Sequence, residues 1–114
     1  QRAGPEEVAE RTIDCFMRVL PASVPGVVFL SGGEPDGSVT ANLNALNQRA
    51  NDVGAPWQLS FSFGRSLQGA PLAAWAGKAE NIEAAALAFY TRARLTSTAR
   101  QGSYVPEEEE KTAV

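Results

Sequence analysis

Two short segments of this sequence carry residue types suited to holding an anion. Ser31-Gly32-Gly33 offers a hydroxyl group and two backbone amides that no side chain shields. Glycine accepts the positive φ angles that turn successive N–H groups toward one point, and such a concave arrangement favours anions. Gly64-Arg65 opens an expected helix, where free N–H groups attract an anion and the arginine fork suits phosphate oxygens. The sequence therefore predicts an anion site, suited to phosphate, at Ser31, Gly32, Gly33, Gly64 and Arg65.

Each of these motifs also has an ordinary structural explanation. A Ser-Gly-Gly segment is more often a simple turn, and an arginine at a helix start is more often a surface charge. Ser62 follows the polar positions of its strand, so its side chain can simply point into a barrel interior. The pair of motifs is more specific because each follows a predicted strand. Neighbouring strands lie about 4.8 Å apart, so their two loops can converge on one phosphate.

Two segments have the patterns of strands. Residues 26–30 form a continuous apolar run rich in β-branched side chains, which predicts a strand buried on both faces. Residues 57–63 alternate between apolar and polar side chains, the period of a strand with two different faces. Apolar stripes predict helices over residues 5–20, 38–50, 65–75 and 79–100. A strand, a helix and a second strand in this order form a βαβ unit with parallel strands.

This set of elements is too small for an independent α/β fold. Two parallel strands do not make a stable sheet, which needs at least three strands or equivalent cover. A complete (β/α)₈ barrel needs about 250 residues, whereas this chain has 114. The sequence therefore predicts an incomplete piece of an α/β fold. Its apolar surfaces need the rest of that fold, on a longer chain or on a separate one.

The composition excludes several classes of function. The net charge is −3, and it arises entirely from a carboxyl-terminal segment in which four glutamates precede Lys111. We expect residues 106–114 to form an acidic, solvated and disordered tail. The neutral body argues against nucleic-acid binding, and no apolar run approaches the roughly 20 residues that span a bilayer. The sequence contains no histidine, so the commonest acid–base group and metal ligand is missing.

Other polar and reactive residues have structural explanations. Cys15 falls on the apolar stripe of the first helix, which predicts a buried, unreactive thiol. Lys78 follows a glycine near a helix start, where an exposed loop position explains it. Trp57 and Trp75 are expected to pack. Three asparagines lie within one predicted helix, and we expect polar contacts with neighbouring loops or subunits from Asn42, Asn44 and Asn47.

A series of short blocks, taken in order, resembles the carboxyl-terminal third of class I fructose-bisphosphate aldolase over about residues 5–104. The resemblance implies the last two βα units of a (β/α)₈ TIM barrel, with residues 1–105 as part of one barrel domain. The blocks lie at residues 26–33, 42–47, 56–57, 59–65, 67–68, 74–75, 77–78, 80–81 and 101–104.

The resemblance also implies a function. It implies reversible cleavage of fructose 1,6-bisphosphate to dihydroxyacetone phosphate and glyceraldehyde 3-phosphate through a lysine Schiff base, with no metal or other cofactor. By this resemblance the phosphate of the dihydroxyacetone half would be held by Ser31, Gly32, Gly33, Gly64 and Arg65, with Ser62 as a neighbour in the same pocket. The implied partners are a sugar phosphate, the remainder of the barrel and further copies in a tetramer, with no nucleic acid or membrane. The implied compartment is the cytoplasm, or a plastid.

The sequence departs from the family pattern at three points. Neither Lys78 nor Lys111 matches the Schiff-base lysine, which the resemblance places on a strand ahead of this sequence. No aromatic residue follows Tyr104, although many family members end in a tyrosine that reaches the active site. Phe63 stands where many relatives have tyrosine. An alternative is therefore a non-catalytic phosphate-binding or interaction module derived from an aldolase-like gene.

Overall fold

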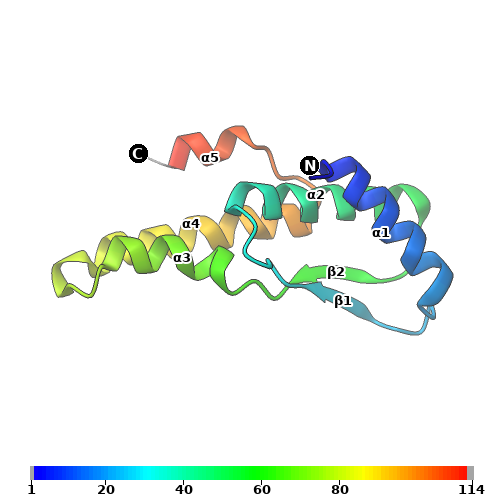
Figure 1. Ribbon diagram of the computed structural model, residues 1–114, viewed down its shortest axis with the longest axis horizontal. Coiled ribbons are helices and arrows are strands. Elements are labelled where there is room, and N and C mark those ends of the chain that lie inside the picture. The colour runs from blue at the N-terminus through cyan, green and yellow to red at the C-terminus, as the bar shows by residue number, and fades with distance from the viewer. Residues whose placement is uncertain (1, 113–114) are drawn as a thin grey trace.

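The computed structural model describes residues 2–112, with side chains up to residue 109. Helices and strands follow in the predicted order up to residue 100 (Figure 1). A short helix, α5, then lies within the segment that the sequence analysis expects to be disordered. The elements are α1 (Pro5–Val19), β1 (Gly26–Phe29), α2 (Asp36–Val53), β2 (Gln58–Phe61), α3 (Arg65–Trp75), the 3₁₀ helix η1 (Ala79–Asn81), α4 (Ile82–Arg100) and α5 (Glu107–Thr112).

The two strands form a parallel sheet with only one covered face. Val27 pairs with Leu59 and Phe29 pairs with Phe61 in the register of β1 and β2. Helices α1 and α2 cover this face (Figure 1). On the other face Val28 is 63% exposed, and Leu30, just past the strand, is 79% exposed. The prediction of a strand buried on both faces is thus met on one face only, because no described element of this chain covers the second.

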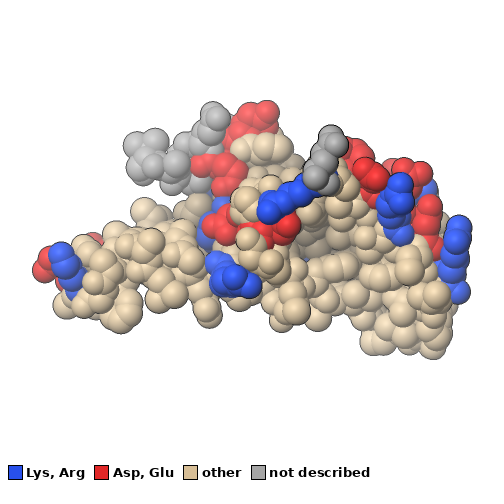
Figure 2. Space-filling model, in the orientation of Figure 1, with Lys and Arg blue, Asp and Glu red and all other residues tan. Residues whose placement is uncertain are grey.

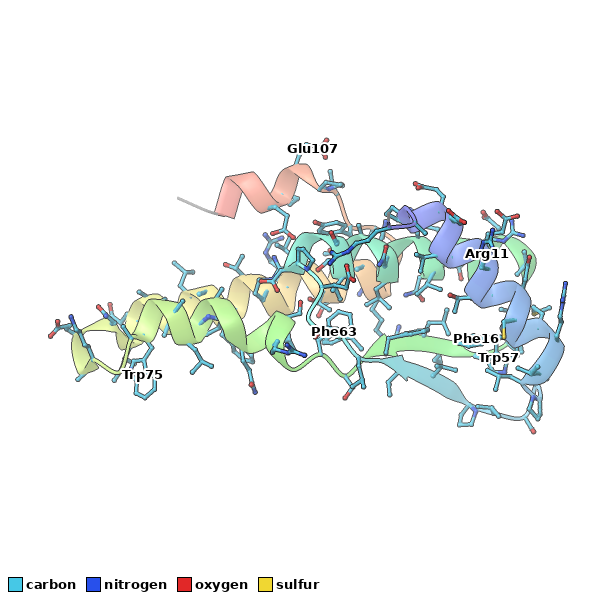
Figure 3. The ribbon with its side chains drawn as sticks, in the orientation of Figure 1. Arg11, Phe16, Trp57, Phe63, Trp75 and Glu107 are labelled. Atoms are coloured by element: carbon cyan, nitrogen blue, oxygen red, sulfur yellow. The ribbon has the colours of Figure 1, made fainter. Side chains whose placement is uncertain are left out.

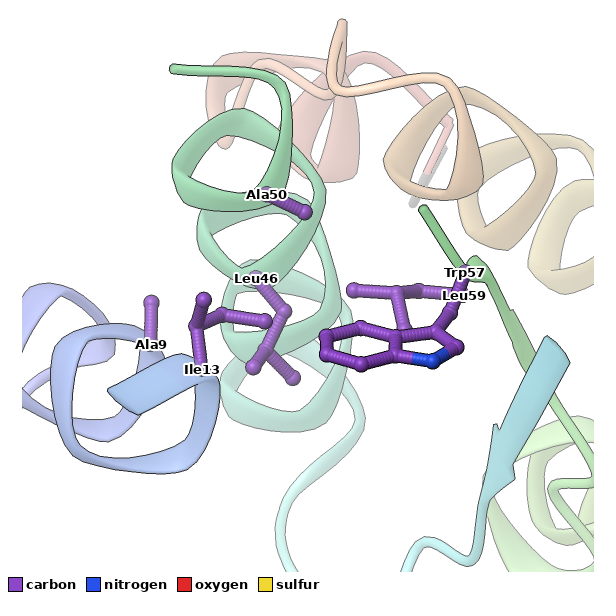
Figure 4. Close-up of a cluster of buried hydrophobic side chains, with 6 residues drawn as sticks. All are labelled: Ala9, Ile13, Leu46, Ala50, Trp57 and Leu59. Atoms are coloured by element: carbon purple, nitrogen blue, oxygen red, sulfur yellow. The ribbon is translucent and has the colours of Figure 1, made fainter. Parts of the chain in front are cut away.

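One core joins α1, α2 and the covered face of the sheet (Figure 4). Trp57 packs edge-on against Phe16, with ring centroids 6.1 Å apart, and its indole N–H donates to the Pro21 carbonyl at 2.9 Å. Trp57 is therefore a packing residue, as predicted. The buried residues of this core are Ala9, Ile13, Leu46, Ala50, Trp57 and Leu59.

The buried stripe of α1 differs from the predicted one. Cys15 is exposed rather than buried, and Val19 is 66% exposed. The stripe that meets α2 instead runs through Ala9, Ile13 and Phe16, at spacings of four and three residues. The apolar surface of α1 is wider than the face that α2 and the sheet cover, so one edge of it stays exposed in this chain.

A second core lies between α2 and the end of α4. Asn47, on α2, ties the layers together: its amide donates to the carbonyls of Leu43 at 3.1 Å, Leu59 at 3.3 Å and Ala99 at 3.3 Å. Asn44 accepts a hydrogen bond from the backbone N–H of Tyr104 at 2.9 Å. The predicted loop contact is confirmed for Asn44, whereas Asn47 contacts carbonyls of α2, β2 and α4 instead of a loop. The buried apolar residues are Val39, Leu43, Phe63, Leu95, Ala99 and Tyr104.

Helices α3 and α4 form a hairpin that extends beyond the sheet (Figure 1). Trp75 lies at its far end and is 43% exposed (Figure 3), so it has little cover in this chain. The first half of α4 also has little cover, with Ile82 58% and Phe89 49% exposed, whereas Thr96 further along the helix is buried. Figure 2 shows little charge along the hairpin between its tip and its base. This distribution is typical of a surface that lies against another part of a protein.

Candidate phosphate site

The two predicted anion-binding loops meet at the carboxyl edge of the sheet. Gly32 and Gly33 have φ angles of 63° and 80°, the left-handed region that glycine tolerates best. A Cβ atom added to Gly33 would lie 3.1 Å from Nη1 and 3.3 Å from Cζ of Arg65. The guanidinium of the second loop therefore lies against the backbone of the first. The absence of a side chain at Gly33 permits this approach.

Strand register explains why the loops converge. Phe29 pairs with Phe61, so β1 and β2 end at the same level. The backbone N–H of Ser62 donates to the Phe29 carbonyl at 2.8 Å and extends the pairing by one residue. The loops after both strands therefore leave the sheet at the same edge. Ligands bind at this edge in parallel α/β proteins, both in open sheets and in barrels.

Several hydrogen-bond donors at this edge have no partner among the described residues. The Arg65 side chain is exposed and makes neither an ion pair nor a hydrogen bond with residues 2–112. The backbone N–H groups of Gly33 and Gly64 likewise donate to none of these residues. Helix α3 starts at Arg65 and carries no acidic residue in its first turn. The site thus combines a fixed positive charge, the positive end of a helix and free amides, an arrangement that favours a phosphate group.

The two predicted serines lie in different surroundings. Ser31 is only 7% exposed, and its carbonyl accepts a hydrogen bond from the Glu34 N–H at 3.2 Å. It also lines a largely apolar cavity of about 170 Å³ between α1, α2 and the end of β1. Ser62 is exposed. Ser31 therefore belongs to the framework of the first loop, whereas Ser62 is open to solvent in this chain.

Ser66 is a polar residue beside the site that the sequence analysis misses. It is 1% exposed, and its hydroxyl group has no hydrogen-bond partner among the described residues. Buried hydroxyl groups are usually paired, whereas this one, directly after Arg65, is closed to solvent and unpaired within the described part of the chain. Its place in the first helical turn, directly after Gly64-Arg65, is the sequence signal that identifies it.

The other candidate residues lie apart from this edge or serve the framework. Lys78 is exposed immediately before η1, beyond the end of α3. Glu80 and Glu83 are exposed at the start of η1 and of α4, where their charges complement the helix dipole. No helix among residues 2–112 has the length and apolar character that crossing a membrane requires.

Comparisons with known proteins show which sequences this chain is similar to. A family model described as "Glycolytic: Fructose-bisphosphate aldolase class-I" matches residues 1–114. Fructose-bisphosphate aldolase B of Gallus gallus is 47% identical over 109 residues, which is 96% of this chain and 29% of the relative. Fructose-bisphosphate aldolase, cytoplasmic isozyme 2, of Pisum sativum is 50% identical over 103 residues, 90% of this chain and 28% of the relative. The chain thus spans less than a third of the length of these relatives.

A chloroplastic relative and a solved structure also match most of this chain but less than a third of their own length. Fructose-bisphosphate aldolase 1, chloroplastic, of Chlamydomonas reinhardtii is 46% identical over 98% of this chain and 29% of the relative. The solved structure is fructose-bisphosphate aldolase from Plasmodium falciparum in complex with TRAP and a small molecule inhibitor. It superposes with a TM-score of 0.84 at 38% identity and covers 92% of this chain and 29% of that chain.

Proposed function

This chain belongs to the class I fructose-bisphosphate aldolase family, and we propose that it supplies the phosphate-binding loops of the complete enzyme. The approach of Arg65 to Gly33 carries the proposal, because it joins a fixed cation to an open glycine loop. In this role the loops hold the phosphate of the dihydroxyacetone half of fructose 1,6-bisphosphate. The proposed residues are Ser31, Gly32, Gly33, Ser62, Gly64 and Arg65.

The proposed phosphate site, called the phosphate clamp from here on, contributes to catalysis by positioning the substrate. Holding the phosphate fixes the distance from the reacting carbonyl carbon to the catalytic groups, which replaces an encounter in solution with an oriented contact. The proposed reaction is the reversible cleavage of fructose 1,6-bisphosphate through a lysine Schiff base. By family resemblance that lysine and the proton-transferring carboxylates lie in the remainder of the barrel.

We propose that this chain forms the last two βα units of that barrel. The uncovered face of the sheet supports the proposal, since Val28 and Leu30 would face the barrel interior. The uncharged surface of the α3–α4 hairpin would lie against other barrel elements (Figure 2). The proposed partners are thus the remainder of the barrel and the sugar phosphate, with further copies in a tetramer. A cytoplasmic or plastid location fits the cytosolic and chloroplastic relatives.

Gly33→Ala tests the clamp in the complete enzyme. We expect affinity for inorganic phosphate, measured by isothermal titration calorimetry, to fall about fivefold, because the new Cβ displaces the guanidinium and weakens a charged hydrogen bond. Alanine at a positive φ also costs about 1 kcal/mol of stability.

Gly54→Ala is the matched control: Gly54 has a φ of 69° and nothing within 4 Å of an added Cβ. It should lose the same stability and keep its phosphate affinity. Equal phosphate affinity in Gly33→Ala and the parent enzyme would contradict the clamp.

A further inference from the structure

A buried arginine lies outside the phosphate site, on the inner face of α4. Arg92 is 5% exposed, and burying a guanidinium is costly unless its charge and donors are matched. Its Nη2 donates to Thr40 Oγ1 at 2.8 Å and to the Asp36 carbonyl at 3.3 Å. Its Nε lies 3.9 Å from a carboxylate oxygen of Asp36 and makes no hydrogen bond within the described residues. Arg92 on α4 therefore binds the first turn of α2, although Arg92 and Thr40 are 52 residues apart in the sequence.

This contact is unusual for its electrostatics. The amino-terminal end of a helix carries positive partial charge, so a cation placed there is repelled by the dipole. Arg92 overcomes this repulsion through specific acceptors rather than through the helix end itself. Thr40 reinforces the turn, since its hydroxyl group also donates to the Asp36 carbonyl at 2.8 Å.

The first turn of α2, which Arg92 contacts, begins at Asp36, three residues after Gly33. Two backbone hydrogen bonds flank this connection: Glu34 N–H to the Ser31 carbonyl at 3.2 Å closes the loop, and Val39 N–H to the Pro35 carbonyl at 3.0 Å begins α2. Only Glu34 and Pro35 separate Gly33 from Asp36, so we expect a shift of Asp36 to move Gly33. Gly33 in turn is in contact range of the Arg65 guanidinium.

The carboxyl-terminal segment completes the cluster. Glu109 accepts a hydrogen bond from Arg92 Nη1 at 2.5 Å and another from the Tyr104 hydroxyl at 2.8 Å. Burial, and then the hydrogen bond and charge of Glu109, raise the pKa of Tyr104, so the phenol stays protonated as a donor. Glu109 thus supplies the negative charge closest to the buried guanidinium. Glu109 lies within α5, so this pair places part of the acidic segment against α4.

We infer that Arg92 is a positioning residue for the phosphate loop, and that Glu109 couples the acidic carboxyl-terminal segment to that loop. The inference rests on the proposed phosphate site. Arg92 touches neither of the two anion-binding motifs in its described contacts. It acts through Asp36 and Thr40, which set where the residues 31–33 can lie.

The test uses Arg92→Lys and Glu109→Gln in the complete enzyme. Lysine keeps the charge of Arg92 but loses the fork that bridges Thr40, Asp36 and Glu109. Glutamine keeps the shape of Glu109 and removes its charge. The matched control is Arg94→Lys, because Arg94 is on the same helix and lies 3.9 Å from Glu108, away from α2.

Two readouts separate positioning from general stability. We expect affinity for inorganic phosphate to fall about fivefold in Arg92→Lys and about threefold in Glu109→Gln, from one weakened hydrogen bond in the site. Amide hydrogen exchange of residues 34–42, measured without phosphate, should become faster in both. Arg94→Lys should change neither quantity. If Arg92→Lys does not fold, Glu109→Gln carries the test with the same two readouts.

The outcomes are distinguishable. Faster exchange with unchanged phosphate affinity assigns Arg92 a purely structural role and overturns the inference, as does a change in neither readout. Equal losses in Arg94→Lys would show general destabilisation of α4 and also overturn it.

The Arg65→Ala variant is measured in parallel. If that variant binds phosphate like the parent enzyme, the proposed phosphate site itself is wrong and the inference falls with it. If Arg65→Ala binds weakly and Arg92→Lys binds normally, only the positioning role is wrong.

Discussion

Replacing Arg65 with alanine in the complete enzyme is expected to lower kcat/KM for fructose 1,6-bisphosphate by roughly 10- to 150-fold, the equivalent of losing about 1.5–3 kcal/mol of charged hydrogen bonding. The guanidinium is the only fixed positive charge that the structure places against the Gly33 backbone among the described residues. Its removal leaves amides and a helix end, which attract a phosphate less strongly. Steady-state kinetics with the parent enzyme alongside measure this loss.

Two further variants sharpen the Arg65 result. Arg65→Lys should recover part of the activity, because lysine keeps the charge but cannot present two parallel donors. Arg11→Ala removes an exposed arginine of α1 whose partner is Glu7 at 3.0 Å, and it should leave kcat/KM unchanged. Unchanged turnover and substrate affinity in Arg65→Ala would refute the assignment of Arg65 to the phosphate clamp.

The 114-residue chain on its own is expected to show no cleavage of fructose 1,6-bisphosphate. It should also form no covalent adduct when borohydride is added together with dihydroxyacetone phosphate. The physical reason is that neither lysine matches the Schiff-base lysine of the family: Lys78 lies beyond the far end of α3, and Lys111 follows the glutamates of the acidic segment. Mass spectrometry after borohydride treatment measures the adduct directly, with the complete enzyme as the positive control.

An adduct on Lys78 or Lys111 would overturn this reading of the chain. The alternative of a free-standing phosphate-binding module makes a different prediction. In that case the polypeptide as isolated has a mass near 12.1 kDa and unfolds cooperatively by itself. The uncovered sheet face, with Val28 and Leu30 exposed, argues against such independent stability.

The strands and the meeting of the two loops that follow them could be predicted because their signals are local. The run over residues 26–30 and the alternation over residues 57–63 identify the strands, and glycines mark the points where the chain leaves them. Parallel pairing then requires both loops to share one edge. The contact between Gly33 and Arg65 follows from those two facts together.

The helix faces could not be predicted in the same way. An apolar stripe shows which surface of a helix avoids water but not which neighbour covers it. Cys15 lies on the apolar surface of α1 and is exposed because α2 covers a different edge of that surface. Phe89 is exposed for a similar reason, since the buried residues of α4 begin only at Arg92.

The role of Arg92 was also beyond the reach of sequence patterns. An arginine in a helix is ordinarily a surface charge, and its partners here come from elements 52 residues earlier and 17 residues later. The same long-range pairing gives the acidic segment a fixed contact that its composition alone does not suggest. Charge patterning predicts how an acidic segment behaves when it is free in solution. Here the buried Arg92 guanidinium binds Glu109 of that segment.

The most direct test of the phosphate clamp is a crystal structure of the complete enzyme with inorganic phosphate bound. The account predicts phosphate oxygens within hydrogen-bond distance of the Arg65 guanidinium and of the backbone N–H groups of Gly33 and Gly64. A phosphate bound elsewhere, with the Arg65 guanidinium and the Gly33 amide both free of it, would contradict the account.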